Sequence, residues 1–225
     1  MNPVRGTGKK AVVLLSGGLD SATTLYYAKS KGYDCKCLIF DYGQRHKKEI
    51  ECAKRVAGAC GADYEIIKIA LPWKGSALLD RRIAIPKKRR HPVKGIPVTY
   101  VPARNTIFLS FAVSCAEATG AGAIFIGANA VDFSGYPDCR AGYYKVFNKL
   151  IERGTKAGAG IKIFVPLISM TKARIIRLGK KLGVPYEHTW SCYTGGKDSC
   201  LTCDSCIIRE KGFREAKIRD PLKKR

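Results

Sequence analysis

A six-residue motif, Ser16-Gly17-Gly18-Leu19-Asp20-Ser21, most constrains the fold of this chain, because of the segments on either side of it. The apolar residues 11–15 precede the motif, and a helix-like segment, residues 22–31, follows it. Two adjacent glycines let the backbone approach an anion closely, while the serine hydroxyls and the N–H groups that open the helix donate hydrogen bonds to its oxygens. The helix dipole adds to this attraction. We therefore expect a phosphate-binding turn here, rather than a plain Gly-Gly turn.

The kind of phosphate chemistry depends on what accompanies the motif. The sequence contains no G-x-x-x-x-G-K-[ST], so it lacks the lysine that follows the β and γ phosphates in P-loop kinases and ATPases. The carboxylate of Asp20 repels a polyanion, and we expect it to orient the turn or to hold magnesium between phosphates. S-G-G-x-D-S resembles the signature of the ATP pyrophosphatases, enzymes that cleave ATP between the α and β phosphates and adenylate a substrate oxygen.

Apolar runs and helical patterns alternate along the chain. We expect strands at 11–15, 35–40, 64–69 and 123–127, and helices at 22–31, 45–60, 106–119, 147–153 and 171–182. This alternation predicts an α/β fold with a doubly wound parallel sheet. Ligands of such sheets bind beyond the carboxyl ends of the strands, where the strand order reverses, so the loops after residues 15, 40 and 127 should share one cleft.

Two of these loops are rich in polar side chains. One is Asp41-Tyr42-Gly43-Gln44-Arg45-His46, placed to reach an adenosine held on the first turn, and the other is residues 129–140. Turn chemistry explains the Asn, Asp, Ser, Gly and Pro residues of the second loop, but it requires neither Tyr136 nor Arg140. We also consider Lys172, which opens the last predicted helix, either as a phosphate ligand or as an exposed lysine of the first turn.

Four cysteines near the end of the chain have metal-ligand spacing. Cys192, Cys200, Cys203 and Cys206 form the pattern C-x7-C-x2-C-x2-C, in which two consecutive x2 spacings let three thiolates converge on one ion. Structural zinc is the interpretation we favour, and an iron-sulfur cluster is the main alternative. The six other cysteines are expected to be small buried hydrophobic residues with reduced thiols.

Composition and charge set the broad class. Hydrophobic residues make up 46% of the 225 residues, but no apolar run is long enough to cross a bilayer, so we expect a cytoplasmic protein without a membrane partner. The formal net charge of +23 favours anionic partners without choosing among them, and RNA contact is one possibility. The densest basic stretch, residues 81–94, contains Pro and Gly and is expected to be an exposed loop.

The assembled blocks resemble the 7-cyano-7-deazaguanine synthase family of the ATP pyrophosphatase superfamily. The blocks are residues 14–24, 40–46, 101–106, 129–140 without residue 133, and 190–193 with the three later cysteines, all in the same order as in the family. The resemblance implies an ATP-dependent carbon-nitrogen ligase that converts 7-carboxy-7-deazaguanine and ammonia to the nitrile, through adenylated acid and amide, for queuosine or archaeosine synthesis. It further implies bound magnesium, one structural zinc ion and a homodimer.

The resemblance also assigns residues. The ATP loop corresponds to Leu15, Ser16, Gly17, Gly18, Leu19, Asp20, Ser21, Ala22, Thr23, Thr24 and Leu25, with Ser16, Asp20 and Ser21 in catalytic roles. The zinc ligands correspond to Cys192, Cys200, Cys203 and Cys206. For the deazapurine we expect Asp132 or Asp138 against the guanine-like N–H edge, Tyr136 stacked on the ring, and Arg104 or Arg140 on the carboxylate. Leu201 departs from the glycine that is common in the family.

The domain organisation expected is a nucleotide-binding domain over residues 1–185 and a zinc knuckle with a C-terminal helical segment over residues 186–225, packed on it. Two other functions are compatible with parts of the sequence. A tRNA-modifying enzyme that adenylates a base would carry an RNA-binding domain or a catalytic cysteine pair, and neither is evident. A non-enzymatic zinc-bearing nucleic-acid-binding protein would explain the charge and the cysteines, but not the phosphate turn.

Overall fold

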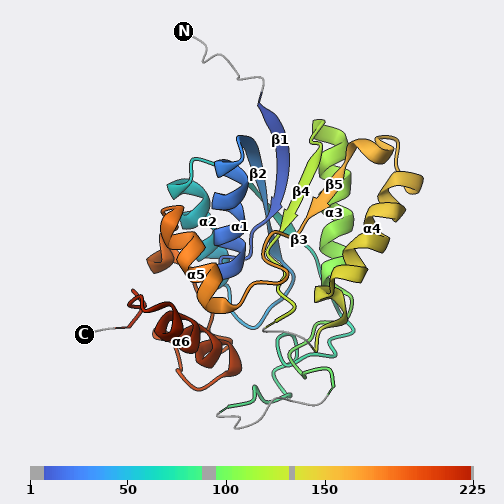
Figure 1. The fold of residues 1–225 in the computed structure, drawn as a ribbon. Helices are drawn as coiled ribbons and strands as arrows, with labels where there is room; N and C mark the ends of the chain where they lie inside the picture. Colours follow the sequence, from blue (N-terminus) through green and yellow to red (C-terminus); the bar gives the residue numbers. More distant parts are fainter. Residues whose placement is uncertain (1–7, 88–94, 132–134, 224–225) are drawn as a thin grey trace.

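A five-stranded parallel sheet forms the centre of the molecule (Figure 1). The computed structural model describes residues 8–87, 95–131 and 135–223. The strands are β1 (Lys9–Leu14), β2 (Tyr33–Asp41), β3 (Asp63–Lys68), β4 (Ala123–Ile126) and β5 (Lys162–Phe164), in the spatial order β3-β2-β1-β4-β5. The chain winds outward from β1 in one direction and then, with β4, in the other. The strand order therefore reverses between β1 and β4, as a doubly wound sheet requires.

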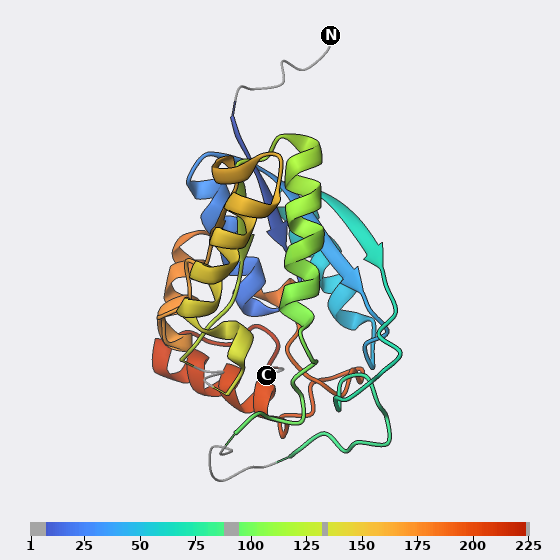
Figure 2. The ribbon, with the colours of Figure 1, turned by 90° about the vertical axis from the view of Figure 1, so that its right-hand side faces the viewer.

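Helices cover both faces of this sheet. On one side lie α1 (Leu19–Ser30), α2 (Lys48–Ala59), α5 (Lys172–Lys181) and α6 (Asp204–Ala216), and on the other lie α3 (Arg104–Thr119) and α4 (Ala141–Gly154), side by side in both ribbon views (Figures 1 and 2). Short 3-10 turns occur at Pro137–Cys139, Gly158–Gly160 and Tyr186–His188. None of the helices in the described part of the chain is both long and apolar enough to span a membrane.

The alternation of side chains along the strands builds two cores. Val13, Cys37 and Phe125 point to the side of α1, α2 and α5, whereas Val12, Leu38 and Ile124 point to the side of α3 and α4. Because both faces are covered, the central strands are apolar at consecutive positions, which is why they stand out in the sequence. Cys35, Cys37, Cys52 and Cys139 are buried, as expected, while Cys60 and Cys115 are partly exposed.

The predicted elements agree with the structure except at several ends. Helix α1 begins at Leu19 rather than residue 22, so Asp20 and Ser21 belong to its first turn. Helix α4 covers residues 141–154, twice the length of the predicted 147–153. Its first five residues include Gly142, a poor helix former, and only one buried side chain, that of Tyr144, so they carry a weak helical signal. Strand β5 was not predicted; it has three residues, of which only Ile163 is buried.

The C-terminal segment shares a core with the sheet. Phe213 and Ala216 of α6 pack with Ile175 and Ile176 of α5, and the ring of Phe213 meets that of Tyr186 edge-on. The last residues of the chain, 209–225, form a basic tail. Its first residue, Arg209, is buried and ion-paired through its Nε, at 2.8 Å, to Asp220. This part of the tail therefore serves internal packing, whereas the division at residue 185 stays a prediction.

Candidate active site

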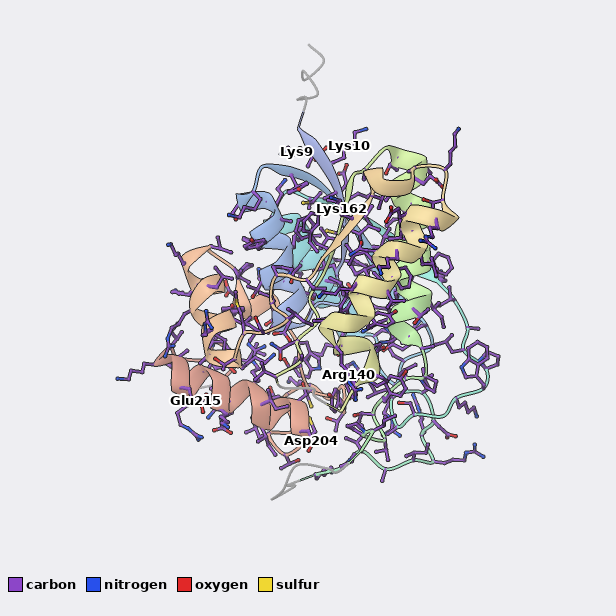
Figure 3. All side chains as sticks on the ribbon, turned by 45° about the vertical axis from the view of Figure 1, so that its right-hand side comes forward. Lys9, Lys10, Arg140, Lys162, Asp204 and Glu215 are labelled. Carbon is purple, nitrogen blue, oxygen red and sulfur yellow. The ribbon has the colours of Figure 1, made fainter. Side chains whose placement is uncertain are left out.

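One cavity of about 260 Å³ opens at the carboxyl ends of the strands. Its walls come from the loops after β1, β2 and β4, from the starts of α2 and α3, and from residues 190–193 and 205–209 near the C-terminus. The expectation that the loops after residues 15, 40 and 127 share one cleft is confirmed. The opposite end of the sheet carries Lys9, Lys10 and Lys162, far from this cavity (Figure 3).

The phosphate turn has hydrogen bonds of its own. The backbone N–H of Ser16 and its hydroxyl donate to the Ser21 hydroxyl oxygen at 3.2 and 3.0 Å, and the Ser21 hydroxyl donates to the Gly18 carbonyl at 3.1 Å. Gly18 is the N-cap of α1 and makes no side-chain cap hydrogen bond, having no side chain. The first turn of α1 therefore presents backbone N–H groups and two hydroxyls toward the cavity, which suits an anion.

Two glycines keep this turn compact. Gly17 has φ of +75°, and a Cβ there would collide with the backbone carbonyl of Glu49 and approach the backbone nitrogen of Ala53. A Cβ on Gly127, at the end of β4, would lie 2.8 Å from the backbone nitrogen of Ser21. The first helix turn is thus wedged between α2 and the end of β4, at the point where the strand order reverses. Only glycine fits these two positions without moving backbone.

Asp20 faces Lys172 across the cavity wall. Both carboxylate oxygens of Asp20 accept hydrogen bonds from Lys172 Nζ, each at 2.7 Å. Lys172 is the first residue of α5, whose N-cap is Thr171, and its stem passes over Gly212 of α6, where a Cβ would strike it. With only 8% of its surface exposed, Lys172 is not the exposed first-turn lysine that we considered as the alternative.

The loop after β2 is held by hydrogen bonds of Gln44 and lies beside aromatic side chains. The Gln44 side chain accepts from the Tyr42 backbone N–H at 2.8 Å and donates to the Phe40 carbonyl at 3.1 Å. The ring of Phe40 stacks on that of Phe108, with centroids 3.9 Å apart. Arg104, the first residue of α3, lines the cavity and donates to the Tyr42 hydroxyl at 3.2 Å. An arginine beside stacked rings is suited to binding a planar anion.

The predicted substrate contacts separate into two groups. Arg104 and Tyr136 line the cavity, and the Tyr136 hydroxyl is 2.7 Å from that of Thr99. Asp138 is buried outside the cavity lining, where its carboxylate accepts from the backbone N–H of Asn105, at 3.4 Å, near the start of α3. Arg140 is exposed and also outside the lining (Figure 3). Asp132 lies outside the described residues.

The site contains a carboxylate that we did not predict from the sequence. Glu49, in the first turn of α2, lines the cavity beside the phosphate turn. Burial raises its pKa to about 7, against the opposing effect of the Arg104 charge. Tyr193 and Trp190 also line the cavity, although the sequence had given them no role. The sequence does carry one signal for Glu49, because this acidic residue lies at the start of a predicted helix, directly after a loop expected to face the cleft.

The four clustered cysteines come together. Their sulfur atoms all lie within 4.8 Å of one another, and Cys192, Cys203 and Cys206 are buried. The backbone N–H groups of Cys200 and Cys203 donate to the sulfurs of Cys192 and Cys200, each at 3.3 Å, an arrangement that supports thiolate charge. Leu201 adopts φ of +57°, a left-handed backbone conformation that glycine adopts without strain but that leucine does not. The cluster fits one tetrahedral metal ion.

This cysteine cluster is joined to the phosphate turn. The Trp190 backbone N–H donates to the Gly17 carbonyl at 2.9 Å, and its indole N–H donates to the Cys192 carbonyl at 2.8 Å. Lys48 lies over the Trp190 ring and donates hydrogen bonds to the carbonyls of Gly196 and Lys197. The cysteine region therefore fixes one wall of the cavity.

Comparison with known proteins gives the family. The family model described as "Queuosine biosynthesis protein QueC" matches residues 10–217. The chain belongs to the QueC family. It is 54% identical over 217 residues to "7-cyano-7-deazaguanine synthase" of Thermoplasma acidophilum, covering 95% of this chain and 91% of that protein. It is 50% identical over 220 residues to the protein of the same name from Trichodesmium erythraeum, covering 95% and 99%.

Solved structures resemble this QueC-family fold more distantly. NMN synthetase from Francisella tularensis has a TM-score of 0.50 at 14% identity, covering 95% of this chain and 89% of that one. A 4-thiouridine synthetase in an RNA complex with bound ATP has a TM-score of 0.50 at 21% identity, covering 94% of this chain and 51% of that one. At these identities the likeness concerns the fold alone.

Proposed function

We propose that this protein is an ATP-dependent ligase that converts 7-carboxy-7-deazaguanine and ammonia to 7-cyano-7-deazaguanine. The observation that carries the proposal is the single cavity in which a phosphate turn, at Ser16–Ser21, meets an arginine and an aromatic wall. Near full-length identity of about one half to proteins named 7-cyano-7-deazaguanine synthase supports the same substrate. The product would serve the synthesis of queuosine or archaeosine.

The chemistry requires two activations at one place. A carboxylate is a poor electrophile, so its oxygen attacks the α phosphorus of ATP and pyrophosphate leaves. Ammonia then displaces AMP to give the amide. The amide oxygen is adenylated by a second ATP, and loss of AMP leaves the nitrile. One phosphate turn is sufficient for both rounds, because pyrophosphate is the leaving group each time.

The phosphate turn would hold the leaving pyrophosphate through residues 15–25. The Ser16 and Ser21 hydroxyls and the backbone N–H groups at the start of α1 would donate to its oxygens. Asp20 has oxygen ligands suited to magnesium, and its pairing with Lys172 places a cation beside them. When magnesium-ATP is bound, Asp20 would face the metal, and Lys172 would then be placed to contact a phosphate.

The substrate would lie between Arg104 and the aromatic side chains. Arg104 would bind the substrate carboxylate, because Arg104 lines the cavity and its guanidinium is held by a hydrogen bond to the Tyr42 hydroxyl. Tyr136 and the stacked pair Phe40 and Phe108 supply the aromatic surface against which a deazapurine packs. Asp138 and Arg140, which lie outside the cavity lining, would act through the loop rather than by contact, and Asp132 retains its sequence-based assignment.

Zinc is the metal that best fits four cysteine thiolates in a closed, buried cluster, and we propose it as a structural ion without a catalytic role. We further propose that ammonia is the nitrogen donor, that the protein is a cytoplasmic homodimer, and that RNA is not required.

The direct test combines purified protein with magnesium-ATP, ammonium and 7-carboxy-7-deazaguanine, and follows AMP and the deazapurine by mass spectrometry. Formation of the nitrile together with AMP is expected. AMP without nitrile, or no turnover by metal-loaded protein, would reject the substrate assignment.

A further inference from the structure

Glu49 occupies a position that none of the roles above uses. Its backbone carbonyl abuts Gly17, so the residue lies against the phosphate turn, and its side chain lines the same cavity as Arg104. The turn would hold pyrophosphate, and the substrate atoms that react with the α phosphorus must therefore come close to this turn. A side chain next to Gly17 is at the reacting end of the cavity.

No hydrogen-bond or ion-pair partner holds the Glu49 carboxylate within the described ranges 8–87, 95–131 and 135–223. Lys48, its neighbour on α2, points instead to the carbonyls of Gly196 and Lys197. Two carboxylates of the described residues line the cavity, those of Asp20 and Glu49, and the Asp20 carboxylate is hydrogen-bonded to Lys172. Glu49 is therefore the carboxylate available to a substrate.

The proposed reaction needs a proton acceptor at this place. Ammonia carries three hydrogens, and the nitrile nitrogen carries none, so three protons leave the same nitrogen during one catalytic cycle. The first leaves as ammonia displaces AMP. The second leaves when the amide oxygen bonds to the α phosphorus and the carbon–nitrogen bond becomes a double bond. The third leaves when the C–O bond to AMP breaks and the C≡N triple bond forms.

We propose that Glu49 is the catalytic base that accepts these protons from the substrate nitrogen and passes them to water in the open cavity. The inference rests on the proposed function and adds a residue and a role to it. No oxidant or further reactant is required, because AMP carries away each oxygen and the carboxylate returns to its charged form after each transfer.

The surroundings of Glu49 suit this role. The groups that interact electrostatically with it are Arg104 on α3, Tyr42 after β2, Cys52 on α2 itself, and Cys192 and Tyr193 in the cysteine region. Burial is the largest effect on its pKa, and Arg104 keeps the charged form accessible near neutral pH. Other cavity groups are less suitable: the Cys139 thiol has its pKa raised to about 12 by burial, and His46 packs on Gly195.

The test uses the amide, 7-amido-7-deazaguanine, as the substrate, because the step from amide to nitrile needs no ammonia and its pH dependence is free of ammonium titration. Glu49→Gln is expected to lower kcat for nitrile formation about 10²- to 10⁴-fold, with little change in the KM for amide or ATP. In the unaltered protein, kcat/KM should rise with pH through about 7, and this limb should be lost in the variant.

Two further variants separate catalysis from structure. Glu51→Gln, on the exposed part of the same helix turn, should behave as the unaltered protein. Glu49→Ala should regain activity when formate is added, as only a missing carboxylate base would allow. A higher KM with unchanged kcat in Glu49→Gln, or an unchanged pH limb, would overturn the proposal while leaving the ligase intact. If the unaltered protein makes no nitrile, the proposed function and this inference fail together.

Discussion

Lys172 Nζ donates to both carboxylate oxygens of Asp20, each at 2.7 Å, and so links the first residue of α5 to the first turn of α1. The two residues are far apart in the sequence, but both are nearly buried beside the phosphate turn. The pair places a positive charge where pyrophosphate would leave and fixes the carboxylate that would hold magnesium. It is therefore the contact on which nucleotide binding should depend most.

Replacing this lysine should weaken ATP binding. Lys172→Ala leaves the Asp20 carboxylate without this cation, so a phosphate would meet an uncompensated negative charge. We expect at least about a tenfold loss of ATP affinity, equivalent to about 1.4 kcal/mol, in a calorimetric titration. Lys180→Ala, on the exposed face of the same helix, is the matched control and should bind as before. Equal affinities for the two variants would contradict this role of Lys172.

Gly17→Ala should damage both stability and the phosphate turn. The added Cβ meets the backbone of Glu49 and Ala53, which cannot move without shifting α2, and the residue keeps a positive φ. We expect a loss of more than about 2 kcal/mol in the free energy of unfolding and loss of ATP binding. Gly43→Ala also has positive φ but meets no atom within 4 Å, so denaturant unfolding should reveal a loss of only about 1 kcal/mol.

Removing the metal should affect the cavity as well as stability. The cysteine cluster packs with Trp190, whose backbone N–H holds the Gly17 carbonyl, so loss of the ion should loosen the phosphate turn. Elemental analysis should find one zinc ion per chain. Cys206→Ser is expected to lower both metal content and melting temperature, whereas Cys115→Ser, at a partly exposed cysteine outside the cluster, should change neither much. Full stability without metal would contradict a structural role.

The Cys139 thiol should be chemically inert despite lining the cavity. Burial, helped by the charge of Asp138, raises its pKa to about 12, so almost none is thiolate at pH 8. Iodoacetamide at that pH should leave Cys139 unmodified in the folded protein, as peptide mass mapping would reveal, and should label it after unfolding in denaturant. Rapid labelling of the folded protein would contradict this environment.

The charged Glu49 carboxylate should lower the free energy of unfolding above neutral pH. Its pKa is raised from 4.5 to about 7 in the folded protein, so the folded state binds more protons than the unfolded state between these values. Stability therefore falls as pH rises through this range. Glu49→Gln removes the charge and should raise the melting temperature by about 2–4 °C at pH 8, but less at pH 5. An equal change at both pH values would contradict the raised pKa.

The sheet and its ligand-binding edge could be predicted from the sequence because the central strands are buried on both faces and the phosphate turn follows the first of them. Strand β5 could not, since three residues with one buried side chain carry no periodic signal. The cysteine cluster was predictable because its ligands are close in sequence. The place of Asp138 behind the cavity, and of Lys172 against Asp20, depends on how distant segments pack, which spacing along the chain does not encode.

Isotope transfer from the substrate carboxylate tests the account most directly. With both carboxylate oxygens of 7-carboxy-7-deazaguanine labelled as ¹⁸O, two adenylations at one site predict two molecules of AMP per nitrile, each with one ¹⁸O. Mass spectrometry of AMP and of the deazapurine gives both quantities from one reaction. Label in water or phosphate instead of AMP, or AMP formed without the nitrile, would contradict the proposed ligase.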